Sequence, residues 1–256
     1  MFRFLITPKW IAFHLLVVVL VVAMVNLAFW QLRRLDQRRE FNARVETNQS
    51  KPRVDFDELR PALAEPAAVE WRQVNVTGIF VPGHEFLVVN RSQNGETGRN
   101  VVDALQLTDG TLLLVNRGFV READATPAVP TGSIEIVGRL RVGERRGTGQ
   151  PADASTGVLT EIRRIDIDVL AKQFDGPVIP MYVEQLKPTS PLEEIVAPTL
   201  DEGPHLSYTV QWFIFSGCVI VGWVLAVRRS LATRSGKPTK KRRSAYIPIA
   251  DDESAS

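Results

Sequence analysis

Two long apolar segments without a formal charge constrain this chain more than any other feature of its sequence. Residues 11–30 read IAFHLLVVVLVVAMVNLAFW, and residues 209–227 read TVQWFIFSGCVIVGWVLAV. As α-helices, each would be roughly 30 Å long, which matches the hydrocarbon core of a bilayer. Apolar residues surround the whole first helix, so a one-sided amphipathic helix is a poor fit. The sequence therefore predicts transmembrane helices at residues 10–32 and 208–227.

A cleaved signal peptide is the alternative interpretation of the first segment. The apolar part of such a peptide is usually about 7–15 residues long and leads to small residues at a cleavage site. Here the apolar run is longer and is followed by QLRRLDQRRE. Trp10 and Trp30 also bracket it, as aromatic residues do at both surfaces of a membrane. These features favour an uncleaved anchor.

The charges are distributed unevenly, although the whole chain has a formal net charge of only +2. Residues 33–207 carry 26 acidic and 21 basic side chains, whereas residues 228–256 carry 3 acidic and 8 basic ones. A basic excess beside apolar segments indicates a membrane protein rather than a nucleic-acid-binding protein. The basic tail predicts a cytoplasmic C-terminus, and two spans then place residues 1–9 in the cytoplasm as well.

Residues 33–207 should consequently lie outside the cytoplasm. The arginines that follow the first apolar segment favour the opposite orientation when that segment is considered alone. The asymmetry around the second segment is larger, and long domains are translocated largely regardless of their charge. No Arg-rich amphipathic presequence precedes the first helix, so we expect a bacterial plasma membrane.

The region between the apolar segments has the composition of a β-rich domain. It holds 13 of the 16 prolines and 14 of the 17 glycines, which divide the chain into short elements. Alternating Val, Ile, Leu and Phe between these residues predict strands. The expected strands are residues 72–81, 85–90, 101–107, 111–116, 133–141 and 178–186. The predicted fold class is an α+β membrane protein, in which two transmembrane helices flank a mainly antiparallel β domain, either a sandwich or an open barrel, with one or two short helices.

Local signals predict the remaining elements. Asp109-Gly110 is typical of a hairpin turn. Residues 166–174 should form a helix that Asp166 caps. The first transmembrane helix should continue outward to residue 48. The other segments are expected to be irregular: a linker marked by prolines at 52, 61 and 66, a loop at 187–207, and a disordered cytoplasmic tail at 228–256.

The usual catalytic and nucleotide-binding motifs are absent from the sequence, which has no Walker loop, GxGxxG, HExxH, CxxC or GxSxG. A single cysteine, Cys218, excludes an intramolecular disulfide and an all-cysteine metal site. The three histidines, His14, His84 and His205, lie far apart, which makes a His-rich metal cage a poor expectation. No set of nucleophile, base and acid can be assembled from the spacing, so we expect a protein that is not an enzyme.

His205 is the residue whose position most suggests chemistry. It precedes the second apolar segment by four residues and lies near Tyr208, Trp212 and Phe213. An imidazole at the membrane surface beside aromatic residues is suited to be an axial ligand of a haem. The alternative is a histidine that only forms hydrogen bonds among the lipid headgroups.

Four blocks of sequence point to a known family. NLAFWQLRRLDQRRE at 26–40 has the form of a signature that ends a first helix, and residues 87–120 contain a Gly-x-x-Gly turn and the strand end VNRGF. VIPMYVE at 178–184 and HLSYTVQWF at 205–213 follow in the same order. Together they resemble the surfeit locus protein 1 family of cytochrome c oxidase assembly factors. Three residues depart from the family pattern: Ala28 replaces glycine, Phe119 replaces tryptophan and Val210 replaces alanine.

The resemblance implies a two-helix membrane protein whose central domain faces the periplasmic side. Such proteins help to mature subunit I of haem–copper oxidases, with the insertion or handling of haem a as the proposed role. His205 matches the histidine assigned as a haem ligand in some bacterial relatives. Trp212 could pack on the porphyrin or anchor the helix at the interface, and Arg117 could pair with a haem propionate or form an internal salt bridge. The other residues at motif positions are Trp30, Gln31, Arg34, Asn116, Gly118, Tyr208 and Gln211.

The resemblance also implies the partners. These are cytochrome c oxidase subunit I and other subunits of respiratory complexes, with haem a as a transient cofactor. Membrane lipids as partners, and no nucleic acid, follow from the apolar segments and the charge distribution. Two alternatives stay open. The chain could be a stable non-catalytic accessory subunit of the oxidase or of a respiratory supercomplex, or else a membrane-tethered hydrolase or ligand-binding sensor.

Overall fold

The computed structural model describes residues 3–153 and 157–234. The chain forms two compact units, one of residues 1–38 and 202–256 and the other of residues 39–201. Most of the tail that the sequence predicts, residues 235–256, lies outside the described residues.

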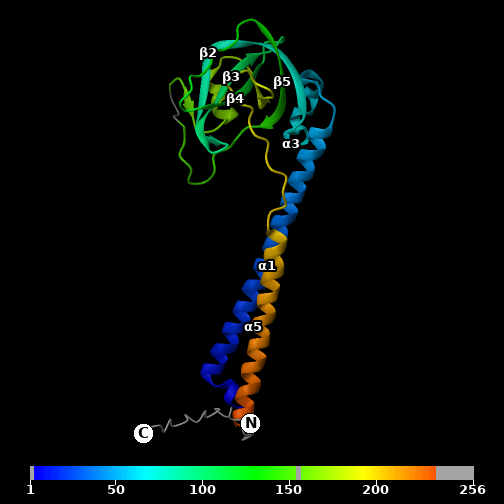
Figure 1. The fold of residues 1–256 in the computed structure, drawn as a ribbon, viewed down its shortest axis with the longest axis vertical. Coiled ribbons are helices and arrows are strands. Elements are labelled where there is room, and N and C mark those ends of the chain that lie inside the picture. Colours follow the sequence, from blue (N-terminus) through cyan, green and yellow to red (C-terminus); the bar gives the residue numbers. More distant parts are fainter. Residues whose placement is uncertain (1–2, 154–156, 235–256) are drawn as a thin grey trace, which may run out of the picture. The chain divides into compact units, whose positions relative to one another are not determined.

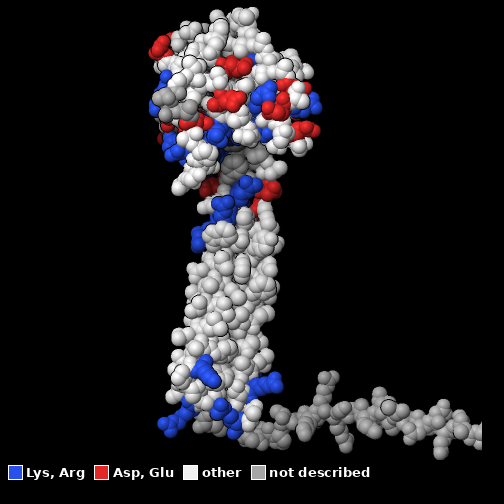
Figure 2. Space-filling view, turned by 90° about the vertical axis from the view of Figure 1, so that its left-hand side faces the viewer, with Lys and Arg blue, Asp and Glu red and all other residues white. Residues whose placement is uncertain are grey.

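The first unit is a pair of antiparallel helices. Helix α1 spans Pro8–Ser50, with residues 39–50 in the second unit, and helix α5 spans His205–Arg234; a short 3-10 helix, η1, lies at Arg3–Ile6. Both long helices contain a segment long and apolar enough to cross a membrane. The surface of the pair is almost free of charge, with Lys and Arg gathered at its ends (Figure 2). The two predicted apolar helices are therefore present, and α1 continues to Ser50, close to the expected residue 48.

Three small residues are buried in the helix pair, as is the larger Leu35. Ala28 is completely buried, and Thr209 and Ser216 of α5 are nearly so. Each hydroxyl donates to the backbone oxygen four residues earlier, at 3.0 Å from Thr209 and 2.9 Å from Ser216. Small side chains at such positions allow apolar helices to approach closely. Ala28, which departs from the family's glycine, is small enough for this position.

The second unit is a β domain. Its strands are β1 (Val54–Asp55), β2 (Gln73–Gln93), β3 (Glu96–Gln106), β4 (Leu112–Arg121), β5 (Ser133–Val142), β6 (Glu161–Ile162) and β7 (Val178–Gln185). Its short helices are α2 (Phe56–Leu59), η2 (Arg60–Ala64), α3 (Pro66–Val69), α4 (Ile167–Leu170) and η3 (Ala171–Gln173). The expected β-rich domain with short helices is confirmed. The proline-marked linker is not irregular throughout, because α2, η2 and α3 lie in it.

Five strands of this domain close into a barrel. Strands β2, β3 and β4 follow one another as antiparallel neighbours, and β5 returns to pair with β2, which is a Greek-key arrangement. Strand β7 then pairs with both β4 and β5 and completes the ring. Only the β4–β7 pair of the ring is parallel. The barrel alternative of the prediction is therefore the observed one, and its sheet closes (Figure 1).

Strand β2 makes this closure possible because it is long enough to pair with two strands, β5 and β3. Its first part, residues 73–79, pairs with β5, and residues 79–93 pair with β3. The ladder is irregular between Phe80 and Glu85, where Pro82 and Gly83 lie. The sequence predicts two strands here because proline and glycine usually interrupt a ladder. In the structure they mark a bulge in one continuous strand.

Alternating side chains of the ring divide into two apolar layers. One layer contains residues from all five ring strands, such as Val76, Leu105 and Val183, and fills the barrel. The other lies on the outside of β2, β3, β4 and β7 and is covered by the connection between β5 and β7, which includes α4. The predicted helix at 166–174 is this α4, followed by η3.

The predicted hairpin turn joins β3 to β4. Its loop has Gly110 at φ +83°, and the Gly110 N–H donates to the Leu107 oxygen at 2.9 Å. A glycine in the left-handed region at the end of a three-residue loop is common in hairpins.

Candidate functional site

His205 and Gln31 meet across the helix pair. The Nδ1 atom of His205, the first residue of α5, lies 2.8 Å from Oε1 of Gln31 in α1. Both residues come from the blocks that carry the family resemblance, and they are 174 positions apart in sequence. The structure therefore unites two motif residues that the sequence could not connect.

With the Gln31 oxygen facing the ring, this contact favours the His205 tautomer that carries its proton on Nδ1. The side-chain oxygen of Gln31 can only accept a hydrogen bond, so Nδ1 of His205 must carry the proton and donate it. Nε2 of a neutral ring then bears the lone pair. Among the residues that the structure describes, no hydrogen-bond partner is found for Nε2. A histidine whose second nitrogen is held by an oxygen acceptor is the usual arrangement for a metal ligand.

Other motif residues of the helix pair divide between two faces of α5. Trp212 follows His205 by seven residues, or about two turns, and therefore lies on the same face. It is half-buried, and its ring meets Phe215 edge to face at 6.0 Å. Tyr208 is exposed and lies on this face too, three residues after His205 and four before Trp212. Gln211 is exposed and lies on another face. On α1, Trp30 and Arg34 are also exposed, and Arg34 donates to Oε1 of Gln37 at 2.9 Å.

His14 also joins the two helices, but its Nδ1 accepts a hydrogen bond, whereas Nδ1 of His205 donates one. Nε1–H of Trp223 donates to Nδ1 of His14 at 2.8 Å. Since Nδ1 accepts, Nε2 of a neutral His14 carries the proton and has no lone pair to offer a metal. His84 lies in the β domain, where its ring packs on Phe174 with the centroids 4.7 Å apart. Within the described residues, no cluster of three or more His, Cys, Asp or Glu side chains could hold a metal ion.

Arg117, a predicted cofactor-binding residue, points into the barrel. Its Nη1 atom lies 3.0 Å from Oδ2 of Asp103, and Nη2 donates to the Ala128 oxygen at 3.0 Å. The guanidinium also lies over the ring of Phe80, 5.7 Å from its centroid. This arrangement is the internal salt bridge that the sequence left open as the alternative to a haem-propionate contact.

The neighbouring motif residues shape the end of β4. Oδ1 of Asn116 accepts from the backbone N–H of Gly118 at 3.2 Å. Gly118 has φ +141°, and a Cβ there would lie 2.7 Å from the backbone oxygen of Glu193. Only glycine fits both the backbone angle and this close approach. The bend lets Phe119 exchange two backbone hydrogen bonds with Glu193, of 2.8 and 2.7 Å.

A charged network that the sequence did not predict lies on the outside of the barrel. Glu184 of β7 accepts from Arg139 at 2.6 Å, from Arg141 at 2.9 Å and from the Tyr182 hydroxyl at 3.3 Å. Arg141 also stacks on Trp71, 3.7 Å from the ring centroid. Burial is the largest influence on the pKa of Arg141 and lowers it, but Glu184, Tyr182 and Glu70 together outweigh burial, so the net pKa is raised. Burial, reinforced by Glu184, raises the pKa of Tyr182 well above its usual value.

This network forms one wall of a cavity of about 410 Å³. Nothing in the sequence marks the cavity, because its residues come from β2, β3, β4, β5 and β7 and from the segments that follow β2, β5 and β7. Alternation along β4 and β7 could have placed Asn116 and Glu184 on the outer face of the barrel. The pairing of the strands was needed to bring them together.

The comparisons with known proteins point to one family. Residues 18–217 match the SURF1 family. A SURF1-like protein of Monosiga brevicollis is 30% identical over 228 residues, which cover 82% of this chain and 85% of that protein. An uncharacterized SURF1-like protein of Mycobacterium tuberculosis strain H37Rv is 27% identical over 227 residues, covering 86% and 83%. Surfeit locus protein 1 of Takifugu rubripes is 31% identical over 175 residues, covering 59% and 71%. The resemblance found in the sequence blocks is thus confirmed: the chain belongs to the SURF1 family.

Proposed function

We propose that this protein is a membrane-bound assembly factor for cytochrome c oxidase that handles haem a during the maturation of subunit I. It would do so by binding and orienting its cargo, without catalysing a reaction of its own. Membership of the SURF1 family supports the assembly role. The hydrogen bond between Gln31 and His205 is the observation that carries the haem role.

The residues around His205 fit a haem as cargo. Gln31 holds the ring proton on Nδ1, which directs the lone pair of the neutral ring to Nε2. Trp212 lies two turns further along the same face of α5, where its indole offers a flat apolar surface. The haem would contribute the iron that His205 coordinates. The chain would contribute a fixed imidazole at the start of an apolar helix.

The proposal includes an orientation in a bacterial plasma membrane. Both termini would be cytoplasmic and the β domain would be extracytoplasmic, as the basic C-terminal flank of α5 favours. A cysteine introduced as Asn94→Cys in a Cys218→Ser background tests this in intact cells with a membrane-impermeant maleimide. Labelling without lysis is expected. Labelling only after lysis would overturn the orientation.

The function is tested by spectra of membranes from a deletion strain. A lower reduced-minus-oxidised haem a signal is expected, with recovery when the wild-type gene is restored. A normal haem a signal in the deletion strain would contradict the assembly role. Stoichiometric copurification with mature oxidase would indicate an accessory subunit instead of a transient factor.

The haem role is tested separately with the purified protein, after coexpression with the enzymes of haem a synthesis. A Soret band is expected for the wild type and is expected to be much weaker in His205→Ala. Gln31→Leu should weaken or shift the band, because the imidazole loses the acceptor that fixes its tautomer. Gln211→Leu is the matched control, since Gln211 is exposed on another face of α5. Absence of haem from every form would overturn the ligand role but not the assembly role.

A further inference from the structure

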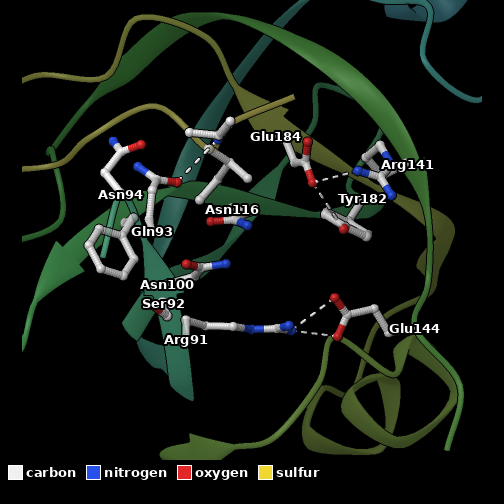
Figure 3. A pocket seen from close by; sticks show the side chains of 13 residues that line it. Arg91, Ser92, Gln93, Asn94, Asn100, Asn116, Arg141, Glu144, Tyr182 and Glu184 are labelled. Carbon is white, nitrogen blue, oxygen red and sulfur yellow. Dashed lines mark hydrogen bonds and ion pairs between the residues drawn. The ribbon is translucent and has the colours of Figure 1, made fainter. Parts of the chain in front are cut away.

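The cavity beside Glu184 has a floor made of two carboxamides. Asn100 of β3 and Asn116 of β4 are on neighbouring strands, where Asn100 pairs with Phe119 and Val102 pairs with Asn116. Their amide groups lie side by side and face the open space (Figure 3). All lining residues belong to the β domain, so the cavity is complete within one compact unit.

Asn100 and Asn116 are buried residues whose carboxamides lack some or all of their possible hydrogen bonds within the described part of the chain. Asn100 is only 8% exposed, and its side chain forms no hydrogen bond with any described residue. Asn116 is 1% exposed; its oxygen accepts from Gly118, and its Nδ2 group has no partner within the described part of the chain. Neither amide is fully enclosed by the described residues, so each reaches the open space of the cavity, where a polar group usually pairs with a ligand or with water. Both amides face the cavity, which is where a ligand could pair with them.

The charged groups around the cavity are already compensated. Nη2 of Arg91 lies 2.6 and 2.9 Å from the two carboxylate oxygens of Glu144. Arg141 pairs with Glu184 and, at 3.3 Å, with Glu70. Because each cation has its carboxylate, the cavity offers no excess charge to an ionic ligand. Its unsatisfied groups suit an uncharged ligand that both donates and accepts hydrogen bonds.

The rim of the same cavity shows which ligand a carboxamide binds here. The side chain of Gln93 donates to the backbone oxygen of Glu194 at 3.0 Å and accepts from the backbone N–H of Val196 at 3.1 Å. One carboxamide thus pairs with two peptide groups of the segment that follows β7. Asn100 and Asn116 are the same functional group, on the floor below, without such a segment.

We propose that this cavity binds an extended, uncharged polar segment of a partner polypeptide, whose peptide groups pair with Asn100 and Asn116 as residues 194–196 pair with Gln93. A volume of about 410 Å³ lies within the range of ligand pockets. Main-chain recognition of an extended segment is a common mode of peptide binding. The partner is an extracytoplasmic loop of oxidase subunit I; this choice of partner rests on the proposed function.

The test uses the purified full chain in detergent and overlapping fluorescein-labelled peptides that cover the extracytoplasmic loops of subunit I of the same organism. Fluorescence anisotropy measures their binding. We expect at least one peptide to bind, and Asn100→Leu to weaken it about tenfold or more, through the loss of two hydrogen bonds. Because Asn100 has no internal partner, this variant should melt at or above the wild-type temperature.

Asn75→Leu is the matched control, since Asn75 also lies on a strand but lines a different cavity. It should leave peptide affinity within twofold of the wild type. Lack of binding by every peptide, equal binding of a scrambled peptide, or binding that Asn100→Leu does not weaken would overturn the inference. The proposed function is judged independently by the haem a spectrum of the deletion strain, so either can fail while the other stands.

Discussion

Arg117 and Asp103 form an ion pair inside the barrel, with Nη1 and Oδ2 3.0 Å apart and side chains 5% and 0% exposed. Oδ1 of Asp103 is buried without a hydrogen-bond partner among the described residues. Burial raises the pKa of Asp103 to about 6, despite the opposing effect of Arg117. The pair fixes the end of β4 directly before Gly118, and it makes the stability of the domain sensitive to both charge and pH.

Arg117→Leu should strongly destabilise the β domain. Removal of the guanidinium leaves the Asp103 carboxylate buried and unpaired, which typically costs about 3–5 kcal/mol. For a domain of this size, the melting temperature of the purified protein should fall by roughly 6–20 °C. Arg121→Leu is the control, because the Arg121 side chain is half exposed and its pair with Asp124 is superficial. Equal melting temperatures for the two variants would refute the structural role of Arg117.

Asp103 should make the protein more stable as the pH falls from about 6 to about 4. Its pKa is higher in the folded state, about 6, than the ordinary 3.8, so the folded state binds more protons in this window. Asp109 does not interfere, because hydrogen bonds from Thr111 lower its pKa and move its effect to more acidic pH. Melting temperatures measured from pH 4 to pH 7 should show this slope in the wild type. The slope should be flatter in Asp103→Asn, and an unchanged slope would disprove the assignment.

Gly118→Ala should destabilise the protein more than Gly110→Ala. Both glycines have positive φ, but a Cβ at Gly110 meets nothing within 4 Å, whereas one at Gly118 meets the Glu193 oxygen at 2.7 Å. Backbone strain alone costs roughly 1–2 kcal/mol, and only Gly118→Ala adds a collision with backbone. Thermal melting of the two variants gives the order. A larger loss for Gly110→Ala would contradict this account of the β4 bend.

His14→Ala should leave the haem content of the purified protein unchanged, in contrast to His205→Ala. Nδ1 of His14 accepts from Trp223, so its Nε2 carries the proton instead of a lone pair. Trp223→Phe should lower stability by only about 0.6–2 kcal/mol, the usual contribution of a hydrogen bond between apolar helices. A Soret band that disappears in His14→Ala would show that the two histidines do not differ in this way.

Several elements followed from local sequence because the forces that form them act within a few residues. The apolar segments became helices of membrane length, and the Asp109-Gly110 turn formed where it was expected. The two strands predicted at 72–81 and 85–90 were instead one strand, β2. Pro82 and Gly83 are tolerated there because the bulge lies where β2 changes from one neighbour to the other.

In the candidate site, too, the local sequence marked single residues, whereas their contact partners came from distant parts of the chain. The block around His205 marked a residue at the start of a membrane helix, and the VNRG block marked the end of β4. The acceptor that fixes the His205 ring, the carboxylate that pairs with Arg117 and the Asn100–Asn116 floor could not be found in the same way. They are set by the packing of α1 against α5 and by the register of β3 on β4.

The sequence by itself determined that this chain has two membrane-length helices around a β-rich domain of the SURF1 family, because hydrophobic length, turn residues and motif blocks are local properties. Only the tertiary structure decided that the sheet closes into a barrel, that Gln31 orients His205 and that Asn100 and Asn116 face one cavity. The physical reason is that these contacts join strands and helices far apart in the chain, where pairing and packing, not neighbouring residues, select the partner.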